Sequence, residues 1–199
     1  MAELKFMSDY SGQTVDELLA LAATCRIDGL VLAFEQAIQQ KEASKGEDSL
    51  SEPECIVLAI EALEREVNNG GYAQFFVNES RIYTPIIVDA LQRIGCPLSS
   101  QITALALNAA GFEGLSVHAL KDALESYQAA YTRRHRRRPA PLIEMQIVSS
   151  MPPAPQPDPL GDALEEALNA FDQAYFRSGE DIAGRLFEFL RANKSSIQL

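Results

Sequence analysis

Apolar residues recur every three or four positions through most of this chain, which is the spacing of amphipathic helices. The first such segment opens at Thr14-Val15-Asp16-Glu17, a capping box in which a hydroxyl and a carboxylate satisfy free N–H groups at a helix start. A break or bend is expected at Asp28-Gly29, and a second apolar run continues to about Ala43. The pattern therefore predicts two helical segments before a polar loop at 44–49.

The next segment carries strong helix signals. Ser51-Glu52-Pro53-Glu54 supplies an N-cap, an early proline and a glutamate three residues after the serine. Asn69-Gly70-Gly71 is expected to end this helix, because glycine adopts positive φ without a steric penalty. At about 100° per residue, a buried face of Ile56, Ile60, Leu63 and Val67 lies opposite an acidic face of Glu54, Glu61 and Glu64.

Helical spacing continues towards the C-terminus, apart from one long segment. Helices are predicted at 72–78, at 84–94, from Ser99 or Ser100 to 110, at 116–131, and twice more after residue 159. Residues 133–159 hold five arginines and seven of the ten prolines, so an extended loop is expected there. The sequence thus predicts an all-α, compact multi-helix single domain over 1–199, with the Arg/Pro-rich loop 133–159 inserted in it.

Charge and cysteine content narrow the classes of function. The formal net charge of −11 repels nucleic acid and anionic membranes and favours basic partners, although ordinary solubility gives the same balance. Cys25, Cys55 and Cys96 are isolated, which is typical of reduced, buried residues. The first residues lack a signal-peptide pattern, and no stretch approaches the ~20 apolar residues of a membrane span. These features predict a cytoplasmic protein.

Common catalytic and metal-binding patterns are absent from the sequence. His118 and His135 stand in unlike contexts, without HxxxH, HExxH or ExxH spacing. There is no GxSxG motif and no P-loop. Glu165 and Glu166 diverge by about 100° on a helix, which suits a solvated face better than paired acid–base chemistry. We therefore expect a non-enzymatic protein that uses neither a cofactor nor a metal.

Residues 69–80 combine glycines, aromatic residues and amides. Gln74 and Asn78 are four residues apart and share one helix face. In a structural interpretation, their amides satisfy backbone groups freed by the glycine break, while the two phenylalanines enter the core. In a functional interpretation, Tyr72, Gln74 and Asn78 form a binding site for a small molecule or a peptide.

The arginine run has alternatives of its own. Five arginines surround His135 within 133–138, and without them the rest of the chain carries −16, since −11 − 5 = −16. Such a run suits contact with an anion or a nucleic acid. It equally suits docking on the acidic helices of this chain or of a second copy, or a solvated loop.

One string, Asn69-Gly70-Gly71-Tyr72-x-Gln74-Phe75-Phe76-x-Asn78-x-Ser80, resembles the signature of the bacterial DNA-mimic protein family. Weaker matches follow at 90–95 and 171–190, so that the resemblance covers about 50–192, with the Arg/Pro-rich segment as a departure. The resemblance implies an all-helical, dimeric domain that acts as an acidic decoy on the DNA-binding face of a regulator. The signature itself is expected to specify the fold, because function resides in surface sites.

Charge and resemblance together favour a non-enzymatic acidic interaction protein. It would be a DNA-mimic decoy and a homodimer that binds a basic DNA-binding transcription regulator, without direct contact to nucleic acid or a membrane. The alternative is a small-molecule or peptide-binding module centred on 69–80. One helix offers roughly one acid per 4–5 Å, against one charge per ~1.7 Å of B-DNA, so mimicry requires a composite surface. The candidate contact residues are Glu54, Glu61, Glu64, Glu165, Glu166 and Asp172.

Overall fold

The structure is a computed structural model that describes residues 4–135 and 159–199. Within these residues the chain forms eight α-helices and no β-strand, and its only β-type pairing is an isolated parallel bridge between Lys5 and Cys25. The predicted all-α fold is confirmed. The helices are α1 (Val15–Ala20), α2 (Ile27–Lys45), α3 (Glu52–Val77), α4 (Ile87–Arg93), α5 (Pro97–Ala109), α6 (Val117–His135), α7 (Pro159–Arg177) and α8 (Ile182–Ala192).

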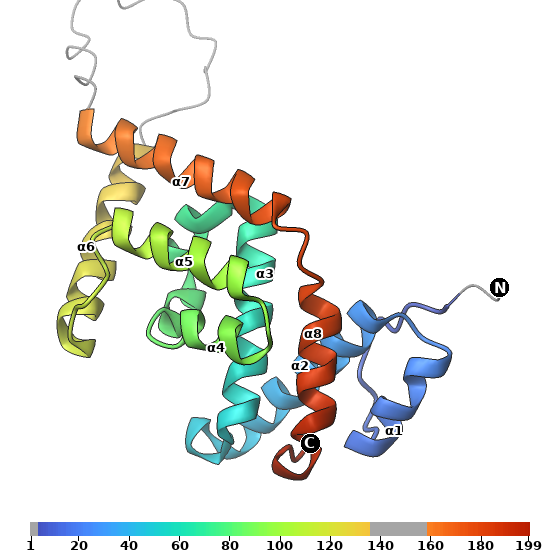
Figure 1. Cartoon of the computed structure of the whole chain (residues 1–199). Coiled ribbons are helices and arrows are strands. Elements are labelled where there is room, and N and C mark those ends of the chain that lie inside the picture. Colours follow the sequence, from blue (N-terminus) through green and yellow to red (C-terminus); the bar gives the residue numbers. More distant parts are fainter. Residues whose placement is uncertain (1–3, 136–158) are drawn as a thin grey trace, which may run out of the picture.

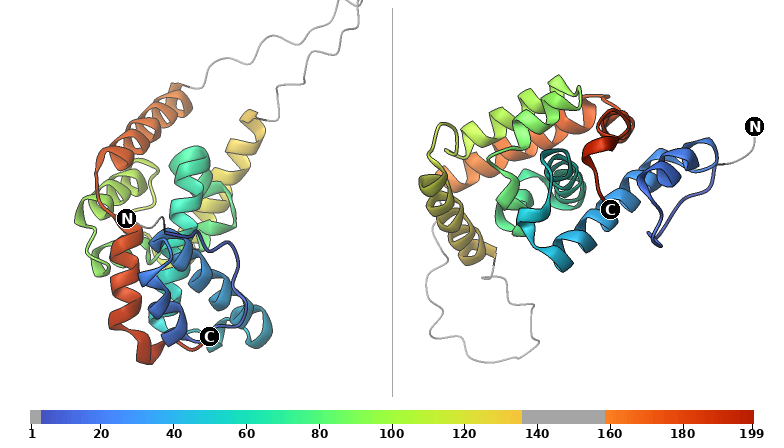
Figure 2. Two further views of the ribbon diagram at one scale, coloured as in Figure 1. Left: turned by 90° about the vertical axis from the view of Figure 1, so that its right-hand side faces the viewer. Right: turned by 90° about the horizontal axis from the view of Figure 1, so that it is seen from below.

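The long helix α3 is the element around which the others are arranged (Figure 1). It contacts α2, α4, α6, α7 and α8. Helix α7 lies side by side with α5, and α8 packs along α2, as the two further views also show (Figure 2). No helix in the described part of the chain is long and apolar enough to cross a membrane. Helices from both ends of the chain therefore pack against one central helix.

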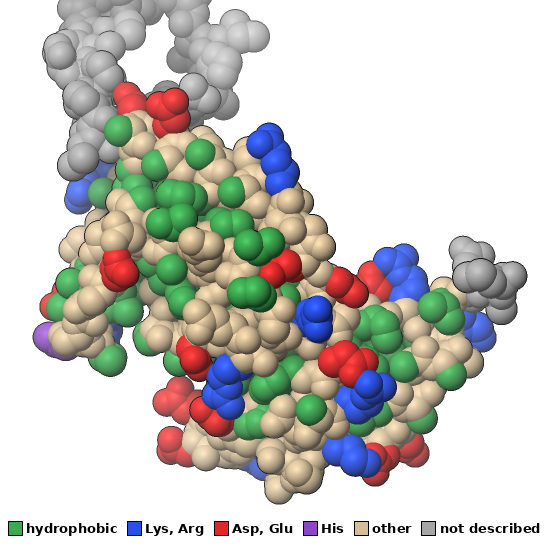
Figure 3. All heavy atoms as spheres, in the orientation of Figure 1, with side chains coloured by type: hydrophobic (Ala, Val, Ile, Leu, Met, Phe, Trp, Pro, Cys, Tyr) green, Lys and Arg blue, Asp and Glu red, His purple; other side chains and the backbone are tan. Residues whose placement is uncertain are grey.

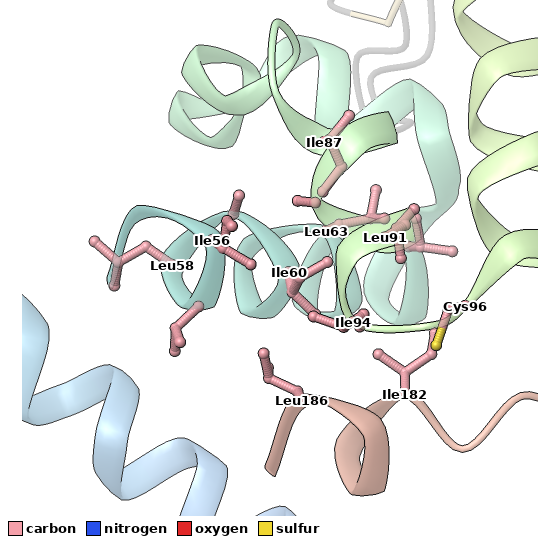
Figure 4. Close-up of a cluster of buried hydrophobic side chains, with 14 of the residues drawn as sticks. Ile56, Leu58, Ile60, Leu63, Ile87, Leu91, Ile94, Cys96, Ile182 and Leu186 are labelled. Carbon is pink, nitrogen blue, oxygen red and sulfur yellow. The ribbon is translucent and has the colours of Figure 1, made fainter. Parts of the chain in front are cut away.

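Aliphatic side chains fill the core where α3, α4 and α8 meet (Figure 4). Ile60 and Leu63 of α3, Leu91 of α4 and Leu186 of α8 are all fully buried. Burying one such side chain contributes about 1.5–3 kcal/mol. Cys96 lies at the edge of the same cluster with its thiol in the protein interior, as predicted, whereas Cys25 and Cys55 are only half-buried.

Both predicted capping boxes are present. Thr14 opens α1 together with Glu17, and Ser51 opens α3 together with Glu54. In the second box the Ser51 N–H donates to Glu54 Oε2 at 2.7 Å, and the Glu54 N–H donates to Ser51 Oγ at 3.4 Å. The local sequence therefore determines where both helices begin.

Glu54 has a second role in the interior. Its carboxylate also accepts hydrogen bonds from Lys41 Nζ at 2.7 Å and from the Gln198 N–H at 2.8 Å, and it is fully buried. Burial alone would raise the pKa of this carboxyl, but the donors outweigh burial and hold the pKa below its usual value. Removing one partner of such a buried pair costs about 3–5 kcal/mol. Glu54 thus joins α2, α3 and the C-terminal tail.

Several predicted helix boundaries are wrong. The break expected at Asp28-Gly29 falls earlier, because α1 gives way to a 3₁₀ turn at Leu21–Ala23 and both residues lie in the first turn of α2. Neither Ser99 nor Ser100 caps α5, which begins at Pro97. Instead Glu180 accepts hydrogen bonds from the N–H groups of Leu98 and Ser99 at 3.0 and 2.7 Å. A carboxylate distant in sequence takes the role of the cap.

The other differences concern 72–95 and the Arg/Pro-rich segment. Helix α4 begins at Ile87, later than predicted, because a 3₁₀ helix at Glu79–Tyr83 and a turn precede it. Helix α6 extends through His135, so the first two arginines of the run are helical and not part of a loop. The rest of the predicted loop, 136–158, lies outside the described residues. The assignment of 1–199 to a single domain stays a prediction.

Candidate functional site

The double glycine interrupts α3, so that two helical halves meet at a kink there, which confirms the break predicted at 69–71. Gly70 (φ −166°) and Gly71 (φ +78°, ψ −174°) interrupt the helical backbone between two helical halves. The bend frees the N–H of Tyr72, which donates to Asp172 Oδ1 of α7 at 2.8 Å. Asp172 therefore caps the second half of α3 from a helix one hundred residues away in sequence.

Glycine is required at the bend for two reasons. Positive φ with extended ψ is a region that residues with a Cβ occupy only at a cost. In addition, a Cβ on Gly71 would lie 2.1 Å from Asp172 Oδ2, and one on Gly70 would lie 2.0 Å from Gln74 Oε1. The close approach of α7 thus depends on the missing side chain of Gly71, whereas Gly70 leaves room for Gln74 of the same helix.

The aromatic residues after the bend belong to the core. Tyr72, Phe75 and Phe76 are fully buried, and the Tyr72 ring meets the Tyr175 ring edge-on at 5.9 Å. Tyr72 Oη lies 2.8 Å from Thr103 Oγ1. Since the Thr103 hydroxyl donates to the Ser99 carbonyl, the tyrosine donates to Thr103. These aromatic side chains join α3 to α5 and α7.

The two amides of this segment have different surroundings. Asn78 Nδ2 and Ser80 Oγ both donate to the buried Glu66 carboxylate at 2.7 Å. They satisfy hydrogen-bond acceptors of an acid inside the protein and hold the turn after α3 against its first half. The half-buried Gln74 lies over Gly70, and Asn69 is exposed. The Tyr72 backbone is satisfied by Asp172 and not by either amide.

The six acids proposed for partner contact lie in different settings. Glu54 is buried and paired with Lys41, so a partner cannot touch it. Its assignment to an outer face was wrong, because α2 and the C-terminal tail cover that side of α3. Half-buried Asp172 holds the Tyr72 N–H, and half-buried Glu64 accepts the Tyr175 hydroxyl at 2.6 Å.

Glu61 and Glu64 line a depression of about 370 Å³ between α2 and α3, together with Glu35 and Arg65. Glu35 is buried and accepts from Arg65 Nη1 at 2.7 Å. Burial, and then the charges of Glu35 and Glu64, raises the pKa of Glu61 to about 8. Burial also raises the pKa of Glu64, although the Tyr175 hydrogen bond opposes this. These acids face a neighbouring helix, which makes them unsuited to an open recognition surface.

Glu165 and Glu166, near the start of α7, are the remaining two. Glu166 is exposed and Glu165 is half-exposed, and Asp162, which the sequence analysis did not select, is exposed beside them. In Figure 3 acidic side chains gather at this end of α7. A second acidic area lies where α3 and α4 begin and includes Glu52 and Asp89, both exposed and both within 4.0 Å of Arg93. Acidic side chains are therefore accessible at both of these separated places.

Groups that could perform chemistry are sparse. Within residues 4–135 and 159–199, no three His, Cys, Asp or Glu side chains are arranged to hold a metal ion. His118 is exposed and lies 3.7 Å from Asp122 on the same helix. A polar depression of about 560 Å³ beside the end of α3 is lined by Arg65, Glu66 and Arg81 among others, with opposite charges in balance.

Replacement of Gly71 by alanine should destabilise the protein by roughly 3 kcal/mol or more, because backbone strain adds to the clash with Asp172. Gly46→Ala is the matched control, since Gly46 has a similar backbone (φ +86°, ψ 162°) with nothing within 4 Å of its Cβ position. Gly46→Ala should lower the free energy of unfolding only by the backbone strain, which is about 1–2 kcal/mol. Urea unfolding measures both variants. Equal losses would contradict the close approach of α7.

Glu61→Gln should change how stability depends on pH. The folded-state pKa of about 8 exceeds the usual value of 4.5, so the folded wild type loses stability as pH rises between them. The amide cannot ionise and should be more stable than wild type above about pH 8, by roughly 1–3 kcal/mol after allowing for partial exposure, and nearly equal to it near pH 5. Glu166→Gln, which removes the same charge at an exposed position, is the matched control. Thermal unfolding at a series of pH values measures the stability of wild type and of Glu61→Gln. If the two stabilities changed with pH in the same way, the raised pKa of Glu61 would be contradicted.

Comparison with known proteins gives a family match. The family model described as DMP19-like protein matches residues 48–193, which is most of the chain and includes the bent α3 and every helix after it. No curated protein matches the chain. No solved structure matches it.

Proposed function

Because the chain belongs to the DMP19-like protein family, a DNA-mimic protein family, we propose that it is a non-catalytic decoy that occupies the DNA-binding face of a basic protein. The partner is a DNA-binding protein, and a transcription regulator fits this role. The observation that carries the proposal is the family match, joined to a net charge of −11. Such a charge attracts the surfaces that proteins present to phosphates.

The contact surface assigned by this proposal is centred on the first turns of α7. Glu165 and Glu166 remain from the original candidates, and Asp162 joins them. The interior acids Glu54 and Glu66 contribute structure only, because each is already bonded to donors of this chain. Three carboxylates on one helix are too few to imitate a duplex, since B-DNA carries one charge per ~1.7 Å. The second acidic area, around Glu52, supplies further charge.

A homodimer is part of the proposal, because it doubles the acidic surface. Two copies of charge −11 repel each other and need a charge-poor face on which to meet. Helix α5 has no charged residue, and its Leu98 and Leu105 are 51% and 48% exposed. Phe176 of the adjacent α7 is 52% exposed, and apolar side chains gather over these two helices (Figure 3). This face suits a second copy better than it suits a basic partner.

The binding proposal is tested by capture from the native cytosol on immobilised full-length protein. A basic DNA-binding protein should be retained at low salt, released at high salt and displaced by duplex DNA. Glu165→Lys/Glu166→Lys should abolish this capture with unchanged melting temperature. Asp122→Lys/Glu125→Lys, an equal charge change on the exposed side of α6, should largely preserve it. If duplex DNA failed to displace the retained protein, DNA mimicry would be rejected.

The dimer is tested by the mass of the protein in solution. Leu105→Glu should convert a dimer to monomers, because it places a charge in the α5–α7 face. Val117→Glu, at a 76% exposed position on α6, is the matched control and should leave the mass unchanged. Light scattering coupled to gel filtration measures both variants. A monomeric wild type, or a dimer that persists in Leu105→Glu, would overturn this part of the proposal.

A further inference from the structure

The end of α6 meets the start of α7 through one arginine. Arg134 Nε lies 3.1 Å from Glu165 Oε1, and the guanidinium also forms an ion pair with Asp162. Asp162 and Glu165 are three residues apart on α7 and therefore share a face. The three side chains retain between 34% and 54% of their exposure. One guanidinium is thus held between two carboxylates at the surface.

The neighbouring residue fixes the end of α6 in this position. The His135 ring stacks on the Tyr131 ring at 3.9 Å, and its Nδ1 lies 2.9 Å from the Tyr131 carbonyl oxygen. Its other ring nitrogen, Nε2, lies 3.8 Å from Glu165 Oε1. The basic end of α6 is therefore directed at the same two acids that begin the proposed contact surface.

The chemistry of this contact is that of arginine recognition. A guanidinium presents a planar set of donors that matches carboxylates and phosphates alike. DNA-binding proteins use the same group to contact the phosphate backbone. Two carboxylates that already hold a guanidinium of this chain have the geometry to hold one from another protein.

We propose that Asp162 and Glu165 form an arginine-binding pair, and that Arg134 occupies the pair in the free protein as an internal competitor. The inference rests on the proposed function and adds its regulation: a partner arginine binds here by displacing Arg134. Ion pairs at this exposure are weak and exchange with solvent, so the contact can yield to a partner. A permanent structural pair would be buried, as Lys41–Glu54 is.

The test measures binding of a fluorescently labelled oligo-arginine peptide to the full-length protein at low salt, by anisotropy. Arg134→Ala should bind about three- to fivefold more tightly than Arg133→Ala, because only the first change frees the pair. Arg133 is the matched control: it is exposed in the same helical turn, and the described residues give it no ion pair. Asp162→Asn/Glu165→Gln in the Arg134→Ala background should remove the gain.

If Arg134→Ala and Arg133→Ala increased the affinity for the peptide equally, the change in net charge alone would explain the increase, and the proposal would be overturned. A gain that survives Asp162→Asn/Glu165→Gln would overturn it as well. Failure here is distinguishable from failure of the proposed function. If duplex DNA displaces a captured basic protein but Arg134→Ala and Arg133→Ala bind the peptide equally, only the role of Arg134 as internal competitor is rejected. If the two variants differ in peptide affinity but no captured protein is displaced by duplex DNA, the arginine-binding pair stands and mimicry is rejected. Unchanged melting temperatures exclude misfolding as the cause.

Discussion

The hydrogen bond from the Tyr72 N–H to Asp172 is the contact that places α7 against the bend of the central helix α3. It exists because Gly70 and Gly71 bend α3 and leave one backbone donor without a helical acceptor. Because the bend also brings α7 close, any side chain at Gly71 would collide with the acceptor. The bend, the cap and the position of α7 are one constraint, and the aromatic residues beside it pack around that constraint.

Asp172 is one of several carboxylates that have structural roles inside this acidic protein. Glu54 joins α2 to the C-terminal tail, Glu66 holds the turn after α3, and Asp172 caps half of a helix. Each is satisfied by donors of the chain, as buried charges must be. The net charge of −11 therefore overstates the charge available to a partner. Recognition has to use acids on outward faces, such as Glu166.

Local signals allowed much of the fold to be predicted, and distant contacts account for some of the errors. The starts of α1 and α3 were predicted because the caps Thr14 and Ser51 lie within three residues of their partners. The start of α5 was missed because its cap, Glu180, comes from after α7. Periodicity placed Glu54 opposite the apolar stripe, but it carries no information about which element covers that side. Asp162 lies on the acidic side of α7 that the sequence predicts, but its ion pair with Arg134 joins residues 28 positions apart, which spacing alone does not indicate.

Burial separates the structural role of an ion pair from a recognition role. Lys41 and Glu54 are nearly inaccessible, and leaving either charge alone in the interior is costly, so this pair remains closed while the protein is folded. Arg134, Asp162 and Glu165 have the same chemistry with a third or more of each side chain exposed, so water can replace either partner. A contact that is easily replaced by water is also easily replaced by a second guanidinium. The exposed pair can therefore exchange its arginine, whereas the buried pair cannot.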